Sequence, residues 1–171
     1  MMLKPARPKQ IRRSVIAVCA VLGLLASADV GKAAAHLQTF TVMTGRCTEL
    51  VLPKENYSPA CTGVLMNEGL VSGRSNFAFL MRTGSTVSFS GPGPERSTGT
   101  DSAALRIDNI IISLNIGPMT PPTSSKATGE CRLAGNPFNG PSQVRCTARG
   151  VDGQYSAEFT TDGGTPLLRA F

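Results

Sequence analysis

The chain has 171 residues and a formal net charge of +6, with 17 lysine and arginine residues against 11 aspartate and glutamate residues. The first 28 residues hold five of the basic residues and no acidic one, so the remainder is nearly neutral, with 12 basic and 11 acidic residues. A near-neutral domain without a run of basic residues lacks the field that attracts a phosphate backbone. The composition therefore argues against nucleic-acid binding.

The N-terminus has the order of parts that is typical of a secretory signal peptide. Five basic residues precede an apolar run over residues 15–25, and three small residues follow at 26–28. This order predicts a helical signal peptide over residues 1–28, and the alanines at 33–35 are compatible with cleavage as late as residue 35. The apolar run is shorter than the roughly 20 residues of a membrane-spanning helix. We therefore expect a periplasmic or secreted protein with no membrane span after cleavage.

Four cysteines remain beyond the predicted signal peptide: Cys47, Cys61, Cys131 and Cys146. An even number in an oxidising compartment predicts two disulfides, although four cysteines allow three connectivities. Their placement as two local pairs favours Cys47 with Cys61 and Cys131 with Cys146. None of the spacings has the short C-x₂-C form of a zinc site, so no metal is expected.

Residues 36–171 predict a single β-rich domain. The 18 glycines and 12 prolines of the chain separate short runs rich in β-branched and aromatic residues, and no clean helical stripe follows the signal peptide. The expected fold class is all-β: a small disulfide-stapled antiparallel barrel or two-sheet sandwich of roughly seven to nine strands.

The first predicted strands follow from alternating apolar residues. They cover residues 37–44, 62–66, 76–82, 86–90, 104–107 and 110–114. The turn at residues 83–85 favours a register that pairs Phe79 with Phe89, since a one-residue slip would place Val87 opposite Arg82. Two long polar segments, residues 91–102 and 115–126, are predicted loops.

The C-terminal third predicts an antiparallel meander. Strands over 128–134 and 143–149 pair Ala134 with Gln143, which places Cys131 opposite Cys146. An Asp152-Gly153 turn then leads into a strand in which Tyr155, Ala157 and Phe159 alternate with polar residues. The aromatic residues that alternate in this way are expected to form the core: Phe77, Phe79, Phe89 and Phe159.

The same register brings arginines together on the outer face of this meander. Arg132 lies opposite Arg145, and Arg149 lies on the same face of the strand. Like charges that are directly opposed destabilise a sheet unless something compensates. Two interpretations remain open: a surface charge lattice with Glu130 and Glu158, or a site where Arg132, Arg145 and Arg149 bind a carboxylate, phosphate or sulfate.

Enzyme chemistry has few candidate residues. His36 is the single histidine and lies beside the predicted mature N-terminus, where a rigid catalytic arrangement is difficult to build. The leading hypothesis is therefore a non-catalytic binding or interaction module of the bacterial cell envelope. Its partner would be an envelope or extracellular protein or an anionic ligand, and no cofactor is expected.

Two alternatives stay open. One is an inhibitor of an envelope or extracellular enzyme that uses the loop at residues 91–102. The other is a small hydrolase that uses the carboxylates of Glu130 and Glu158, which are expected to flank Thr147. Two carboxylates that face each other in a concave site would favour the hydrolase, and a convex end that carries loops would favour a binding protein.

Overall fold

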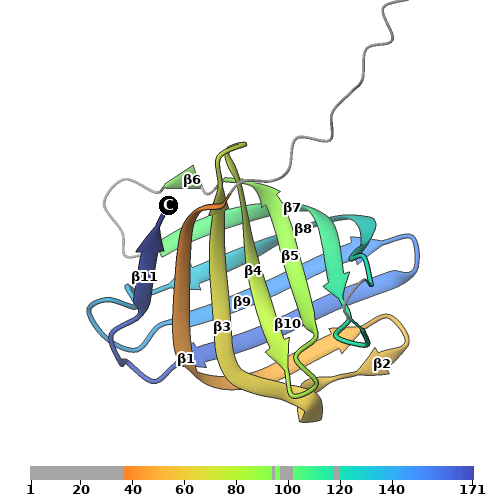
Figure 1. Ribbon diagram of the computed structural model, residues 1–171, viewed down its shortest axis with the longest axis horizontal. Helices are drawn as coiled ribbons and strands as arrows, with labels where there is room; N and C mark the ends of the chain where they lie inside the picture. The colour runs from red at the N-terminus through yellow and green to blue at the C-terminus, as the bar shows by residue number, and fades with distance from the viewer. Residues whose placement is uncertain (1–36, 94, 97–101, 118–119) are drawn as a thin grey trace, which may run out of the picture. The chain divides into compact units, whose positions relative to one another are not determined.

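The computed structural model describes residues 37–93, 95–96, 102–117 and 120–171, which form one antiparallel β-barrel (Figure 1). Eight strands close the barrel in the order β1-β3-β4-β5-β7-β8-β9-β10. They are β1 (Leu37–Leu52), β3 (Cys61–Leu70), β4 (Arg74–Met81), β5 (Thr86–Pro92), β7 (Ser102–Ser113), β8 (Thr123–Ala134), β9 (Gln143–Gly150) and β10 (Gly153–Thr161). The prediction of an all-β disulfide-stapled fold is confirmed, and its barrel alternative is the correct one.

Three short strands and one helical turn complete the described structure: β2 (Glu55–Asn56), the 3-10 turn Ser58–Ala60, β6 (Glu95–Arg96) and β11 (Leu167–Ala170). Among the described residues there is no helix with the length and apolar character that a membrane crossing requires. The predicted signal peptide at residues 1–28, the alternative cleavage at residue 35, and His36 lie outside the described residues.

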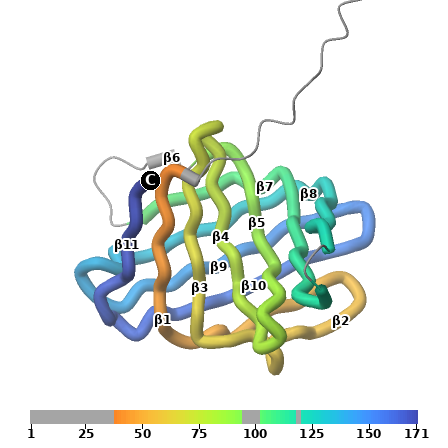
Figure 2. Tube along the Cα trace, viewed as in Figure 1, coloured from red at the N-terminus to blue at the C-terminus, as the bar shows by residue number. Residues whose placement is uncertain are grey.

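Strand β1 closes the barrel because it pairs along both of its edges. One edge pairs with β3, and the other pairs with β11 near its start and with β10 over residues 45–51. A Cβ atom at Gly45 would lie 2.1 Å from the backbone oxygen of Thr160, so only glycine permits this approach of β1 to β10. Figure 2 shows the consequence: β10 runs beside the second part of β1, while β11 runs beside the first part.

Alternation along each strand places the large apolar side chains inside the barrel. Phe79, Phe89 and Phe159 are fully buried, and Phe77 is 8% exposed, which confirms the predicted aromatic core. The rings of Phe79 and Phe89 meet edge to face with their centroids 5.8 Å apart. Aliphatic residues fill the remaining interior: Leu50, Leu65, Val87, Leu105, Ile107, Ile110 and Val144.

The register of the β4–β5 hairpin differs from the prediction by two residues. Phe79 pairs with Val87, and Phe89 pairs with Phe77. The cause is the turn, which has three residues between Met81 and Ser85, with the Met81 N–H donating to the Ser85 oxygen at 2.8 Å. Gly84 occupies the left-handed conformation that such a loop needs, at φ 79°. A shift of two residues leaves every side chain on its predicted face.

The two strands predicted around Asp108 are one strand, β7, with a bulge between Ile107 and Asn109. Arg74 reaches across β5 from β4 and donates to both carboxylate oxygens of Asp108, one of them at 3.0 Å. This pair with Arg74 holds the pKa of the Asp108 carboxyl below its ordinary value. The two hydrogen bonds from the Arg74 guanidinium therefore hold the bulge of β7 against the β4–β5 hairpin.

We expect Asp108→Asn to lower the free energy of unfolding at neutral pH by about 1 kcal/mol or less, because the pair is partly exposed. A carboxyl whose folded pKa is lowered stabilises the protein above its unfolded pKa of about 3.9 and loses that contribution as the pH falls further. The difference between wild type and variant should therefore be constant near neutrality and shrink below about pH 4. Urea unfolding at several pH values measures it, and a difference that grows on acidification would contradict the assignment.

The C-terminal meander has the predicted pairing of β8 with β9. Ala134 pairs with Gln143, and Cys131 lies opposite Cys146 and is bonded to it. The next turn is different from the prediction: Val151 and Asp152 form it, and Gly153 already pairs with Gly150. As a result, the register of β10 against β9 differs by two residues from the register that an Asp152-Gly153 turn predicts.

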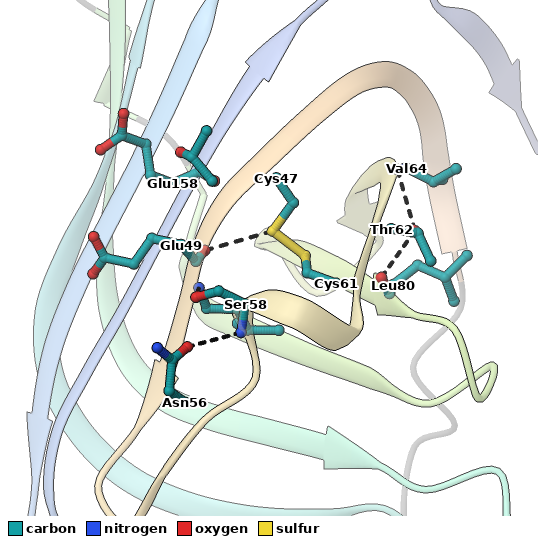
Figure 3. The surroundings of a disulfide bond; sticks show 11 residues. Cys47, Glu49, Asn56, Ser58, Cys61, Thr62, Val64, Leu80 and Glu158 are labelled. Carbon is teal, nitrogen blue, oxygen red and sulfur yellow. Dashed lines mark hydrogen bonds between the residues drawn. A yellow bond between two sulfur atoms is a disulfide. The ribbon is translucent and has the colours of Figure 1, made fainter.

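The second predicted disulfide, Cys47–Cys61, is also present and joins β1 to the start of β3 (Figure 3). Between these cysteines the chain leaves the barrel wall as β2 and the 3-10 turn. Ser58 anchors this excursion, because its hydroxyl accepts from the Leu50 N–H at 2.9 Å and its own N–H donates to Asn56 Oδ1 at 2.9 Å. Both predicted disulfide pairs are confirmed.

The predicted long loops are shorter in the structure. In the first, residues 91–92 continue β5, and β6 pairs with the start of β7, while residues 94 and 97–101 lie outside the described part. In the second, residues 123–126 belong to β8, and residues 118–119 are not described. Pairing with neighbouring strands explains both corrections: residues 91–92 pair with β4, whereas residues 95–96 and 123–126 pair with β7.

Candidate functional site

The predicted arginine cluster lies on the outer face of β8 and β9. Arg132 is directly opposite Arg145, as expected from the register. Each is paired with a glutamate: Arg132 with Glu130, and Arg145 with Glu158 at 2.8 Å. Glu158 lies opposite Arg145 itself and not opposite Thr147, because of the two-residue shift of β10.

The third arginine is separate from the other two. Arg149 lies four residues beyond Arg145 on β9, about 13 Å away by strand rise, and pairs with Thr128 across the sheet. A hollow of about 490 Å³ lies over the first two arginines and does not reach Arg149; its described lining residues are Glu130, Arg132, Ala134, Gln143, Arg145 and Thr147. The structure thus brings together two of the three predicted anion-binding residues, each beside a carboxylate.

We expect the double replacement of Arg132 and Arg145 by alanine to leave the melting temperature nearly unchanged. The two ion pairs are exposed, and pairs of that kind contribute little to stability. Thermal melting followed by circular dichroism, with and without sulfate at modest salt, measures the effect. A sulfate-dependent rise that occurs in the wild type and disappears in the double variant would instead assign the hollow to an anion.

The two carboxylates of the hydrolase alternative do not face a common concave site. Glu130 lies opposite Thr147 as predicted, but its carboxylate forms an ion pair with Arg132. Glu158 accepts hydrogen bonds from Arg145 and from Gln143 Nε2, the latter at 2.8 Å. Both lie on the outer wall of the barrel, where each carboxylate is held by its own neighbours.

A second hollow lies at one end of the barrel, where β1, β4 and β7 begin and β3 and β8 end. It is a cavity of about 430 Å³, within the range of small-molecule sites. We call it the mouth cavity; its described lining residues are Thr41, Met43, Asn67, Phe77, Ser102, Ala103, Leu133, Gly135, Asn136, Pro137 and Phe138.

The strands and one loop place these residues in two groups. Inward-facing positions near the strand ends supply the walls, including the buried Met43 and Phe77. The β8–β9 loop supplies the rim, where Phe138 is half exposed and Pro137 is buried. Eight-stranded barrels have interiors just wide enough to be filled by side chains or to hold one small ligand.

Two carboxamide side chains line the mouth cavity: one has a free hydrogen-bond acceptor, and the other has a free donor. Asn67 Nδ2 donates to Ser75 Oγ at 3.3 Å and to the Asn76 oxygen at 2.9 Å, so both of its hydrogens are used and its Oδ1 remains an acceptor. Asn136 Oδ1 accepts from the Phe138 N–H at 3.0 Å, so its Nδ2 remains a donor. The described lining carries no ionisable side chain. The cavity therefore suits a neutral, mainly apolar group with hydrogen-bonding capacity.

The sequence patterns did not indicate this cavity. Phe77 was assigned to the core, which is correct, but it also forms part of the cavity wall. Two signals were available: Asn67 lies at an inward position two residues after the buried Leu65, and Phe138 is an aromatic residue in a predicted turn.

Comparison with known proteins adds no functional information: no protein-family model, no curated protein and no solved structure was found that matches the chain.

Proposed function

We propose that the chain is an exported, non-catalytic binding module of the bacterial cell envelope, acting in the periplasm or outside the cell, and that it binds a neutral, largely apolar group in the mouth cavity. The observation that carries this proposal is a cavity of about 430 Å³ with apolar walls, two carboxamides and no charge among its described lining residues. Ligand sites typically combine such walls with a few polar groups.

Export is supported by the order of basic, apolar and small residues at the N-terminus. It is also supported by the two disulfides, which form and persist in oxidising compartments. A binding role is favoured over the hydrolase because the described cavity lining contains no carboxylate, whereas Glu130 and Glu158 lie outside it.

N-phenyl-1-naphthylamine is a suitable probe, because it is neutral and apolar, carries one N–H group and fluoresces when it leaves water. We expect it to bind the purified protein, and we expect Ala103→Phe, which fills the cavity from β7, to weaken binding about tenfold or more. Ala104→Phe is the matched control, because Ala104 is the next residue on β7, lies opposite Arg132 and does not line the cavity.

Phe138→Ser provides a second test that places no strain on the barrel, since Phe138 is half exposed. It should weaken probe binding while the melting temperature stays close to that of the wild type. Failure of the wild type to bind the probe, or equal binding by the Ala103 and Ala104 variants, would refute the proposal.

A further inference from the structure

Strand β11 leaves one of its edges open beside the mouth cavity. It pairs with β1, where Leu168 lies opposite Thr41 and Arg169 opposite Phe40, and no described strand pairs with its other edge. Figure 1 shows β11 outside β1, at the margin of the layer that contains β3, β4 and β5. Its two leucines are more than half exposed, at 52% for Leu167 and 54% for Leu168.

The hydrogen-bonding groups of this open edge can be assigned. The Phe171 N–H donates to the Gln38 oxygen at 3.1 Å, so Phe171 belongs to a hydrogen-bonded pair. Such pairs alternate along an antiparallel ladder, so Arg169 also directs its backbone groups toward β1. Leu168 and Ala170 therefore direct their N–H and C=O groups toward the open edge, which offers two donors and two acceptors at strand spacing.

The side chains of β11 divide between two faces. Leu168 shares a face with its partner Thr41, which lines the mouth cavity. Arg169 lies on the opposite, outer face with Phe40 and forms no ion pair with the described residues. A strand added to β11 would thus have alternate side chains directed toward the cavity side and toward an unpaired arginine.

The cavity itself is suited to apolar side chains. Its walls are mainly apolar, and its described lining residues carry no charge. This observation is independent of the open strand edge, and it favours a segment whose inward side chains are apolar.

We propose, on the basis of the proposed binding function, that the occupant of this site is an extended segment of a partner polypeptide that adds as an antiparallel strand to β11. Backbone hydrogen bonds to Leu168 and Ala170 hold the segment, and its apolar side chains turn toward the mouth cavity. The residue opposite Arg169 is acidic. The recognised pattern is apolar–acidic–apolar, with the two apolar residues in hydrogen-bonded positions.

Two of the antiparallel registers that a second copy of this chain could adopt fit the edge poorly. A two-fold axis at Arg169 would place this arginine directly opposite its copy, and directly opposed like charges are destabilising. A two-fold axis at Leu168 would place Pro166, which has no N–H, opposite Ala170. Charge complementarity therefore favours a partner segment that carries a carboxylate.

Labelled heptapeptides with threonine flanks and a Val-Glu-Val centre test this proposal by fluorescence anisotropy with the purified protein. We expect the Val-Glu-Val peptide to bind about fivefold more tightly than a Val-Lys-Val peptide, and we expect Arg169→Glu to reverse that preference. N-methylation of the valines should weaken binding about tenfold, because their N–H groups face β11, whereas N-methylation of the glutamate should have no effect.

Equal binding of the two peptides, or equal effects of N-methylation at all three positions, would overturn the proposal. Dimerisation of the free protein that Arg169→Glu abolishes would do the same, since the edge would then be occupied by a second copy. Binding of N-phenyl-1-naphthylamine without binding of Val-Glu-Val would refute the strand-addition inference and leave the proposed cavity function intact. Failure of both probes would refute both.

Discussion

Replacement of Phe79 by alanine is expected to lower the free energy of unfolding by about 3 to 5 kcal/mol. Phe79 is fully buried at the centre of the barrel and packs edge to face against Phe89. The substitution removes the contacts of a whole ring and leaves a cavity that surrounding strands, fixed by their ladders on both sides, fill only in part.

Urea unfolding followed by fluorescence or circular dichroism measures this loss. Phe138→Ala is the matched control, because the same ring is removed from a half-exposed loop position, and it should cost less than about 1 kcal/mol. Similar losses for the two variants would contradict the assignment of Phe79 to the core and of Phe138 to the rim.

Cys146→Ala is expected to cost about 2 to 5 kcal/mol. The bond that it breaks joins β8 to β9 within the core, and both of its cysteines are fully buried. The disulfide closes a loop of about 15 residues, for which chain entropy alone predicts about 3 kcal/mol. Loss of the sulfur atom adds a packing defect beside Ala157, which lies opposite Cys146 on β10.

Cys47→Ala is the comparison for this experiment. Its disulfide spans nearly the same separation along the chain, 14 residues against 15, but Cys47 is only partly buried. The chain-entropy contribution should therefore be similar for both variants, and Cys146→Ala should be the more destabilising one. A smaller loss for Cys146→Ala than for Cys47→Ala would show that packing around the buried disulfide contributes nothing.

The sequence was sufficient for those features of the fold that depend on local alternation. Period-two patterns predicted the all-β class, the inward phenylalanines and the β8–β9 pairing that places Cys131 opposite Cys146. The registers of the β4–β5 and β9–β10 hairpins were each wrong by two residues. A two-residue shift leaves the same side chains buried, so hydrophobic patterning cannot detect it. The register of each hairpin is set instead by the turn geometry at Gly84 and Gly153.

No local sequence pattern predicted the closure of the barrel or the short strands. The choice between barrel and sandwich depends on β1 pairing with β10, which lies more than 100 residues away along the chain. Strands β2, β6 and β11 have only two to four residues, too few for a pattern, and form because longer strands present them with free edges.

The mouth cavity could not be predicted from the sequence for a related reason. Its described walls come from β1, β3, β4, β7, β8 and the loop after β8, and most of these side chains have the apolar character of a core. Whether such residues fill space or border it depends on how the strand ends diverge, which is a property of the closed barrel. By contrast, the arginine cluster could be predicted, because Arg132 and Arg145 depend on a single local register.

The most direct test of the central claim, that the mouth cavity is a binding site, is to titrate N-phenyl-1-naphthylamine into isotopically labelled protein and follow the amide chemical shifts. We predict saturable shifts concentrated at the barrel end formed by Met43, Asn67, Ala103, Leu133 and the loop at residues 135–138. The amides of Arg145 and Thr147 should move little, because these side chains lie on the outer wall. Shifts concentrated on that outer wall, or no saturable shift at the mouth, would contradict the account.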